Sequence, residues 1–427
     1  MKVLIVGGGG REHAIALKIK ENPEVTALYA APGNGGIAQI ATCLPFKATD
    51  VDGIVRWAAE NKVDFVIVAP DDPLCLGMVD ALAEQGIPAF GPRKNAAIIE
   101  GSKVFSKNLM KKYGIPTAAY ETFDDYDAAV KYLQTADMPI VVKADGLALG
   151  KGVLICPDRD SAVEAVASMM KEAKFGASGA RVVFEAFLTG PEVSVLAFTD
   201  GKTVKPMVSS MDHKRALDHD EGLNTGGMGT IAPNPCYTPE LAQRCMDEIF
   251  LPTIAAMNAE GRTFTGCLYF GLMMTPKGPK VIEYNCRFGD PETQVVLPLL
   301  KSDLLTIMRA TVDGTLADTP VEFASGAACC VVLASGGYPV SYKSGYPISG
   351  LDEAGKTATV FHAGTKLVDG QIVTAGGRVL GVTATADTLE AAIDKAYQAA
   401  DKITFTDMHM RRDIGQRALA SRKESHS

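Results

Sequence analysis

"KADGLALGKG", residues Lys143–Gly152, places two lysines and three glycines within ten positions. This composition is typical of a phosphate-binding loop, but a Walker A loop has four residues between its first glycine and its Gly-Lys pair, followed by Ser or Thr. Here only three residues separate them, and Gly152 takes the place of the hydroxyl residue. The flanking segments 139–143 and 153–156 are apolar and predict strands. The sequence therefore predicts a glycine-rich hairpin between two strands, not a loop that opens into a helix.

The composition is that of a soluble globular protein. The 427 residues are 47% hydrophobic and 22% charged, and this length allows about two to four domains of roughly 100–200 residues. The net charge of −8 argues against nucleic acid as a partner. No apolar run approaches the roughly 20 residues that cross a membrane. The nine cysteines form no Cys-x-x-Cys pair, and Cys329 and Cys330 lie in an apolar strand, which indicates buried free thiols and a cytoplasmic location.

The pattern of elements predicts an α/β and α+β multidomain protein. Strands and helices alternate in the first hundred residues, which predicts a doubly wound parallel sheet over 1–102. A strand-rich central domain is expected over 103–322, and a small C-terminal α+β domain over 323–427. Within the central domain, residues 211–234 predict a long charged and glycine-rich loop, and a loop of this length is usually functional.

"VLIVGGGGREHA", residues 3–14, predicts a strand, a glycine turn and a helix. The spacing of its first glycines is that of a dinucleotide fingerprint, but Glu12 stands where the third glycine belongs. The next strand ends in Ala-Ala-Pro without an acid for a ribose, which disfavours NAD. Two interpretations stay open: a phosphate-bearing ligand near Gly9 and Arg11, or a tight turn without a ligand.

Oxygen-bearing side chains occur at two further strand ends. Asp71, in "APDDP", follows a strand of the parallel sheet, where a carboxylate could hold an amine or simply belong to a turn. Glu283 and Asn285 lie two residues apart on one strand, so they share a face and suit Mg²⁺, although a polar exposed strand is the alternative. Arg287 lies on the same face if the strand continues, and could stabilise developing charge. We find no Ser/His/Asp spacing for a nucleophile triad.

The motifs "GGREHA", "APGN", "FGPRKNAAIIEGSK", "KADGLALGKGV", "SSMDHKR", "NTGGMG" and "EYNCRFGDPETQ" run in this order from residue 7 to residue 294. "GGRVLGVTA" follows at Gly376–Ala384. On these motifs the chain resembles the ATP-grasp superfamily and, within it, the phosphoribosylamine–glycine ligases. The resemblance implies a central ATP-grasp domain with a small hinged lid, at about 123–190, in which the glycine-rich hairpin covers the ATP phosphates.

The resemblance also implies a reaction. ATP would drive the joining of 5-phosphoribosylamine to glycine through glycyl phosphate, giving glycinamide ribonucleotide, ADP and phosphate in purine biosynthesis, with Mg²⁺ or Mn²⁺. Residues implied for ATP are Lys103, Lys143, Gly150, Lys151, Glu185, Ala186, Leu188, Glu192 and Lys214, and those for the metal are Glu283 and Asn285. Those for the two other substrates are Gly9, Arg11, Asp71, Asp212, Asn224, Arg287, Asp290 and Arg378, of which Asp212 and Arg287, with Lys143, are the candidate catalytic residues.

The chain departs from the family pattern at a few positions. Asp71 replaces a common glutamate, Ala186 follows Glu185 where a second acid is usual, and Leu223 replaces a proline. The strand at 268–274 offers no acidic metal ligand, which leaves the number of metal ions open. Alternative functions are an ATP-grasp ligase or carboxylase with another acid and amine, or a nucleotide-binding protein without catalysis. We expect a monomer or weak homodimer.

Overall fold

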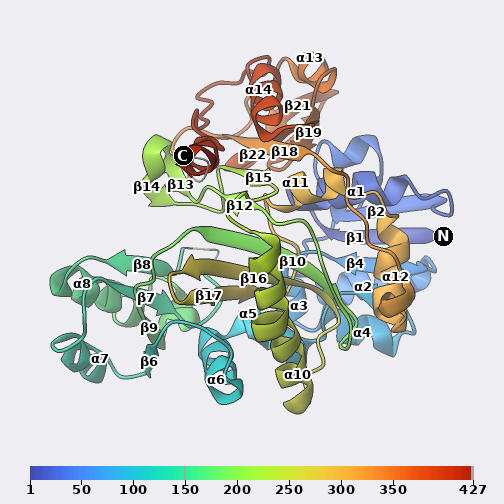
Figure 1. Cartoon of the computed structure of the whole chain (residues 1–427). Helices are drawn as coiled ribbons and strands as arrows, with labels where there is room; N and C mark the ends of the chain where they lie inside the picture. Colours follow the sequence, from blue (N-terminus) through green and yellow to red (C-terminus); the bar gives the residue numbers. More distant parts are fainter. Residues whose placement is uncertain (149–150, 425–427) are drawn as a thin grey trace.

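The first hundred residues form a parallel sheet covered on both faces, in the computed structural model, which describes residues 1–148 and 151–424. Along the first strand, Leu4 and Val6 belong to one hydrophobic core, and Val3 and Ile5 to another on the opposite face. The sheet order is β3-β2-β1-β4-β5, which confirms the predicted doubly wound topology (Figure 1). Its strands are β1 (Lys2–Gly7), β2 (Ala27–Pro32), β3 (Thr42–Cys43), β4 (Phe65–Val68) and β5 (Ala89–Phe90).

The helices of this region are α1 (Gly10–Lys20), α2 (Val51–Glu60), α3 (Asp71–Cys75), α4 (Met78–Glu84) and α5 (Lys94–Gly101). The order of the strands reverses between β1 and β4, because β2 lies on one side of β1 and β4 on the other. Ligands of open α/β sheets bind at the carboxyl ends of strands at such a point. Gly8 and Gly9 follow β1 there, and Asp71 follows β4.

Two antiparallel sheets make up the middle of the chain. The sheet β6-β9-β7-β8 contains the hairpin strands β7 (Ile140–Ala144) and β8 (Val153–Cys156), with β6 (Tyr120–Phe123) and β9 (Val182–Ala186). Helices α7 (Tyr126–Leu133) and α8 (Arg159–Met170) pack together beside it. The sheet β11-β10-β16-β17 consists of β10 (Glu192–Thr199), β11 (Val204–Pro206), β16 (Gly266–Thr275) and β17 (Gly278–Asn285).

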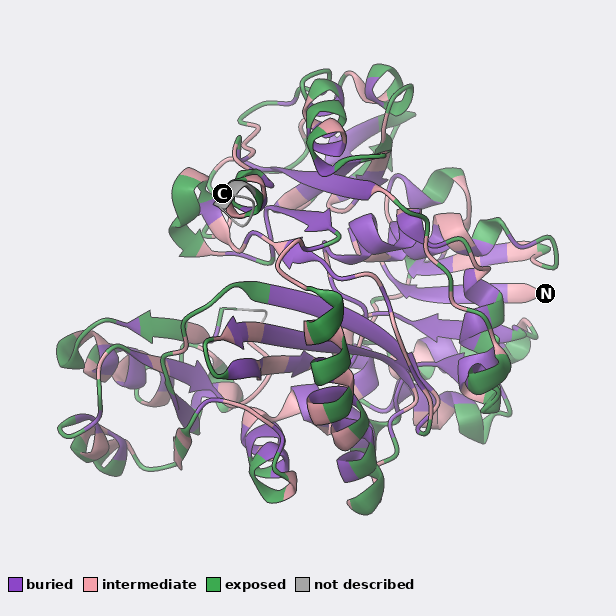
Figure 2. Ribbon diagram, viewed as in Figure 1, coloured by how far each residue is buried: buried purple, intermediate pink, exposed green. Residues whose placement is uncertain are grey.

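Helices flank this second sheet. They are α6 (Lys103–Tyr113), α9 (Pro239–Cys245), α10 (Leu251–Ala259) and α12 (Leu304–Asp313). The short α11 (Thr293–Val296) is instead fully buried and contacts α1. A π-helical turn, Met246–Phe250, joins α9 to α10, so the two helices are continuous but irregular. Figure 2 shows that the strands are buried while the outer faces of these helices are exposed.

The expectation of an irregular loop over 211–234 is wrong. This segment contains four strands, β12 (Met211–Asp212), β13 (Arg215–Leu217), β14 (Glu221–Asn224) and β15 (Gly229–Ala232). β12 and β15 join a five-stranded sheet, β12-β15-β18-β22-β19, whose other strands are β18 (Ala327–Ala334), β19 (Thr359–His362) and β22 (Arg378–Ala386). The strands are short, so their sequence lacks the alternation that predicts a strand. β15 pairs with the buried β18 and with β12, while β13 and β14 pair with each other.

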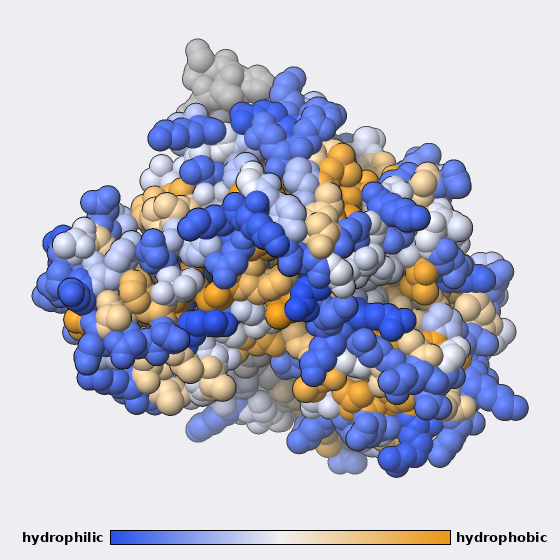
Figure 3. All heavy atoms as spheres, turned by 90° about the horizontal axis from the view of Figure 1, so that it is seen from below, coloured by the Kyte–Doolittle hydropathy of each residue, from blue (hydrophilic) through white to orange (hydrophobic). Residues whose placement is uncertain are grey.

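The remaining C-terminal elements cover this sheet. Helix α14 (Leu389–Ala400) packs on β18 and β22, and α13 (Leu351–Gly355), α15 (Gln416–Glu424) and the hairpin β20 (Thr365–Val368) and β21 (Gln371–Thr374) complete the region. Cys329 and Cys330 are buried free thiols in β18, as predicted. In the part of the chain that the structure describes, no helix is long and apolar enough to span a membrane. Seen from below, the surface is largely hydrophilic with small apolar patches between (Figure 3).

Three histidines are buried in their neutral form. Burial lowers the pKa of His213 to about 4 and that of His362 to about 4; burial, with a smaller contribution from His362, lowers the pKa of His13 to about 3. The hydrogen bonds of two of these histidines explain why their rings stay neutral. The Nδ1 atom of His13 accepts from the backbone N–H of His362 at 2.8 Å, and Nε2 of His213 accepts from the N–H of Gly415 at 3.1 Å. A proton on either accepting nitrogen would break the bond.

These histidines predict a pH dependence of stability. Their pKa values are lower in the folded than in the unfolded chain, so the unfolded state binds more protons as the pH falls through 6.5 toward 4, and stability is lost there. We expect each of these histidines to lower the free energy of unfolding by on the order of 1–2 kcal/mol between pH 7 and pH 5. Urea unfolding of His213→Gln at both pH values should show a smaller loss than the wild-type chain, and the exposed His219→Gln should show none of this difference. Equal pH dependence in all three proteins would contradict the assignment.

Candidate functional site

The glycine turn after β1 is closed by an acidic side chain. Glu12, which is 1% exposed, accepts a hydrogen bond from the backbone N–H of Gly9 at 2.7 Å and one from Nε of Arg11 at 2.8 Å. Glu12 therefore caps α1 in place of the third glycine of a dinucleotide fingerprint. The amide of Gly9 is occupied by this carboxylate, so a phosphate ligand near the turn needs other donors.

A pocket of about 340 Å³ lies beside this turn. Residues from three distant parts of the chain line it, and among them are Gly9, Asp290 and Arg378, three of the residues that the resemblance implied for substrates. Arg378 supplies the positive charge: its Nη1 donates to the backbone oxygen of Asp290 at 2.9 Å, and its Nη2 lies 3.6 Å from a carboxylate oxygen of the same residue. The lining consists of Gly8, Gly9, Gly33, Asn34, Asp290, Tyr338, Ala363, Gly364, Thr365, Ala375 and Arg378.

Asn34 holds the two sides of the pocket together, and our sequence reasoning did not single it out as a site residue. Its Nδ2 donates to the backbone oxygens of Gly8 at 2.9 Å and of His362 at 2.8 Å. Its Oδ1 accepts from the N–H of Gly36 at 3.0 Å. One amide side chain thus joins the glycine turn of the parallel sheet to β19. Its place in "APGN", directly after a strand of that sheet, was the available signal.

Arg287 lies between the parallel sheet and the end of β17. Its Nη2 is 3.1 Å from Oε1 of the buried Glu100, while its Nε is buried without a hydrogen-bond partner among the described residues. Glu100 also accepts from the N–H of Cys286 at 2.7 Å. Burial alone would raise the pKa of Asp71, but the positive charges of Arg287 and Arg11 lower it, so Asp71 is a carboxylate near this guanidinium.

A second cluster of charges gathers where β7, β9 and β17 meet. Lys143 is 2.9 Å from Oε1 of Glu185 and donates to the backbone oxygen of Ile282 at 3.1 Å. Lys103 donates to the backbone oxygen of Gly146 at 2.9 Å. Burial alone would raise the pKa of Glu283, but the positive charges of Lys214, Lys143 and Lys103 together lower it to about 2. This is a carboxylate surrounded by lysines, a setting suited to phosphates and a divalent cation.

Glu283 and Asn285 lie on one face of β17, as predicted, with the buried Tyr284 between them on the other. The amide of Asn285 fits best with its nitrogen donating to Oε1 of Glu100 at 2.9 Å and to the backbone oxygen of Tyr284. In that orientation its oxygen is turned away from Glu100. One carboxylate and one amide oxygen therefore fit a divalent cation; the described residues form no site of three or more His, Cys, Asp or Glu side chains.

Lys214 and Asp212 come from the segment expected to be a loop. Lys214 is 3.5 Å from Glu283 and 3.7 Å from the half-exposed Glu192. Burial raises the pKa of Asp212, as does the nearby Glu292. Gly227, with φ +123°, passes so close to Asp212 that a side chain there would collide with its carboxylate, 2.6 Å away. Asn224 ends β14 opposite Arg215, three residues before this glycine.

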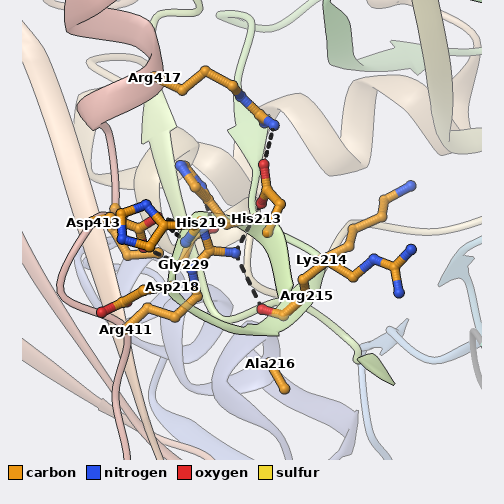
Figure 4. A network of polar contacts seen from close by, with 12 residues as sticks. His213, Lys214, Arg215, Ala216, Asp218, His219, Gly229, Arg411, Asp413 and Arg417 are labelled. Atoms are coloured by element: carbon orange, nitrogen blue, oxygen red, sulfur yellow. Dashed lines mark hydrogen bonds and ion pairs between the residues drawn. The ribbon is translucent and has the colours of Figure 1, made fainter. Parts of the chain in front are cut away.

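Residues of the C-terminal segment contact the segment 211–234 and hold it in place (Figure 4). Arg411 is buried and pairs with Asp220 and Asp413, and it donates to the backbone oxygen of Arg215 at 3.1 Å. His213 donates from Nδ1 to the backbone oxygen of Gly229 at 3.1 Å, since its Nε2 accepts from the N–H of Gly415. These contacts fix the backbone on both sides of Lys214. His213 is thus a satisfied structural histidine.

The other predicted residues lie at the edge of this cluster. Ala186 is exposed, Leu188 is half-buried, and the side chain of Glu185 turns inward, so backbone groups of 185–188 are what this edge presents. Lys151 instead reaches the C-terminal region, where its Nζ donates to the backbone oxygen of Pro339 at 3.3 Å. The prediction for Gly150 lies outside the described residues.

Comparison with known proteins identifies the family. Models of the N, ATP-grasp (A) and C domains of phosphoribosylglycinamide synthetase match residues 1–100, 101–293 and 328–417. A phosphoribosylamine–glycine ligase of Halalkalibacterium halodurans is 48% identical, with 100% of this chain and 99% of that protein covered. The chain belongs to the phosphoribosylamine–glycine ligase family. This confirms the resemblance, and it does not favour an ATP-grasp ligase or carboxylase with another acid and amine, or a nucleotide-binding protein without catalysis.

Other members agree. The Agrobacterium fabrum ligase is 48% identical over 99% of this chain and 100% of its own. The crystal structure of the Thermotoga maritima phosphoribosylamine–glycine ligase superposes with a TM-score of 0.86 at 34% identity, covering 97% of this chain and 100% of that one. A biotin carboxylase of Campylobacter jejuni, at 15% identity and a TM-score of 0.74 over 96% of this chain and 92% of that one, shares the fold alone. Members of the family are ATP-dependent ligases that act on small molecules, and the ATP-grasp fold implies ATP and a divalent metal.

Proposed function

We propose that this chain joins 5-phosphoribosylamine to glycine and converts ATP to ADP and phosphate. The observation that carries the proposal is the course of one segment. Residues 283–290 run from the lysine cluster, through Arg287, to the pocket that Asp290 and Arg378 line. Nucleotide and amine substrate would therefore bind at the two ends of this segment, with the reacting carboxylate between them.

We also propose that the chain is divided into three domains, 1–102, 103–322 and 323–427, with a lid at about 123–190. We propose that the protein is cytoplasmic and is a monomer or weak homodimer.

We assign ATP to the lysine cluster. Lys103 and Lys143 would neutralise its phosphates, and Gly150, Lys151 and Lys214 remain predicted contacts of the nucleotide. Backbone groups of Glu185, Ala186 and Leu188 would contact adenine, and Glu192 the ribose. Glu283 and Asn285 would hold Mg²⁺ or Mn²⁺, which supplies charge neutralisation to the phosphates when bound.

Phosphoribosylamine is assigned to the pocket of about 340 Å³. Arg378 is the cation of its lining and would bind the phosphate, close to Gly9 and Asp290. Asp71 and Arg11 stand at the carboxyl edge of the parallel sheet, where the carboxylate of Asp71 would hold the amine. Asp212, Asn224 and Arg287 would surround glycine.

The chemistry proceeds in two steps. A carboxylate does not accept an amine directly because oxide is a poor leaving group. An oxygen of glycine would first attack the terminal phosphorus of ATP, and ADP leaves. The nitrogen of phosphoribosylamine then attacks the carbonyl carbon, phosphate leaves, and the amine loses a proton. Lysines and Arg287 align the reactants and stabilise charge, so no protein nucleophile is needed.

The function is tested by ADP release from the purified protein. Glycinamide ribonucleotide and ADP should form in equal amounts only when glycine, phosphoribosylamine, ATP and a divalent metal are all present. Replacing glycine with alanine or β-alanine serves as the control for the acid. Product formation from another acid at the same rate would contradict glycine as the substrate.

The route through an acyl phosphate predicts the fate of oxygen. Glycine with both carboxylate oxygens labelled with heavy oxygen should transfer one label to inorganic phosphate in each turnover, because that oxygen bridges carbon and phosphorus in the intermediate. Mass spectrometry of the released phosphate measures this. Unlabelled phosphate, with amide still forming, would exclude the intermediate.

A further inference from the structure

Lys107 is a buried lysine that none of the steps above uses. It lies on α6, its side chain is 2% exposed, and its Nζ is 3.2 Å from Oε1 of Glu185. The same oxygen is 2.9 Å from Nζ of Lys143. Lys107 also donates to Oγ1 of Thr117 at 2.7 Å, and that hydroxyl donates to the backbone oxygen of Val281 on β17. Two lysines from different elements therefore share one carboxylate oxygen in the interior.

The charges of this group do not cancel. Burial alone would raise the pKa of Glu185, but Lys143 and Lys107 lower it below its usual value, so it is a carboxylate. Burial lowers the pKa of Lys107 to about 8, against the opposing effect of Glu185, so its amine remains largely protonated at neutral pH. Two ammonium groups and one carboxylate leave a net positive charge. If Lys107 were absent, Glu185 would pair only with Lys143, and the two charges would cancel.

The positions of the two lysines determine which of them presents the surplus positive charge to a ligand. Lys143 donates to the backbone of Ile282, beside Glu283, and it contributes to the lowered pKa of that carboxylate. Lys107 donates instead to Thr117 and lies near the ring of Tyr120, 5.8 Å from its centre. It is thus close enough to Glu185 to balance its charge, and its other contacts among the described residues are with Thr117 and Tyr120.

We propose that Lys107 is a positioning residue that compensates Glu185 and thereby keeps the charge of Lys143 available for the phosphates of ATP. Glu185 pairs with Lys143, and Lys107 prevents that ion pair from cancelling the charge of Lys143. This inference rests on the proposed contact between Lys143 and ATP. It predicts that removal of Lys107 weakens nucleotide binding without any contact between Lys107 and the nucleotide, and that removal of Glu185 compensates.

The test compares five variants, including Lys143→Met, by calorimetric titration with ATP and by steady-state kinetics. Lys107→Met should weaken ATP binding roughly tenfold, about 1.4 kcal/mol, and raise KM for ATP while KM for glycine stays unchanged. The double variant Lys107→Met/Glu185→Gln should regain most of that affinity, and Glu185→Gln alone should bind ATP at least as tightly as the wild-type chain. Lys111→Met, which removes an exposed positive charge from the same helix, is the matched control and should bind normally.

The outcomes separate this inference from the proposed function. If Lys143→Met binds ATP as tightly as the wild-type chain, the assignment of Lys143 to the phosphates fails. If Lys143→Met binds weakly but Lys107→Met does not, or if the double variant is as weak as Lys107→Met, Lys107 acts only through packing and the inference is overturned. Should Lys107→Met fail to fold, Glu185→Gln decides: a loss of ATP affinity in that variant also overturns it.

Discussion

Glu283→Gln should reduce turnover by roughly a thousandfold or more, because it removes the only anionic ligand that we assign to the metal, and such charge neutralisation contributes several kcal/mol. Glutamine has nearly the same shape, so the fold should persist. The positive charges of Lys214, Lys143 and Lys103 would also lose the carboxylate that they surround. We therefore expect the variant to require a higher metal concentration for whatever activity remains.

The measurement is activity as a function of Mg²⁺ concentration, with circular dichroism as the check on folding. Lys214→Met breaks the 3.5 Å ion pair but keeps the carboxylate. It should raise KM for ATP and leave the metal concentration for half-maximal activity unchanged. Near-normal activity of Glu283→Gln at saturating Mg²⁺ would remove Glu283 from the metal site.

Arg287→Met should lower kcat by roughly a hundredfold to a thousandfold, the usual effect of losing one donor to a developing oxyanion. The buried, unpartnered Nε is the donor that we expect to serve the reaction. The same substitution leaves the buried Glu100 without its cationic partner, 3.1 Å away, and an uncompensated buried charge costs about 3–5 kcal/mol. Loss of activity in the single variant therefore has two possible causes.

A double variant separates them. In Arg287→Met/Glu100→Gln the unpaired charge is gone, so stability measured by urea unfolding should recover substantially while activity stays low. Arg287→Lys keeps a positive charge near Glu100 but loses the planar guanidinium, and it should be stable with reduced kcat. If the double variant regains near-normal turnover, the role of Arg287 is structural.

Much of this site could be predicted from short stretches of sequence. The alternation of Glu283 and Asn285 placed both on one face of a strand, since successive side chains of a strand point to opposite faces. Asp71 was expected at the carboxyl edge of the parallel sheet, and it begins α3 directly after β4. These predictions depend only on local periodicity and on the topology that alternating strands and helices impose.

The partners of the same residues could not be predicted in this way. In the sequence, Glu12 was noted only because it replaces the third glycine of a dinucleotide fingerprint. The structure shows that it caps the turn at Gly9. Asn34 bonds to His362, 328 residues further along the chain. The segment 211–234 looked irregular, yet β15 pairs with β18. No spacing in the sequence encodes such distant contacts.

The family, the doubly wound sheet and the residue types at the site could be predicted from the sequence, because turn glycines, strand alternation and motif order are local properties of the chain. Which charges meet depends on the folded structure. Lys107 and Lys143 share the carboxylate of Glu185 because folding brings side chains of α6, β7 and β9 together, and burial there makes each ion pair depend on the other. In a low-dielectric interior a charge acts through its neighbours, and these neighbours are set by folding.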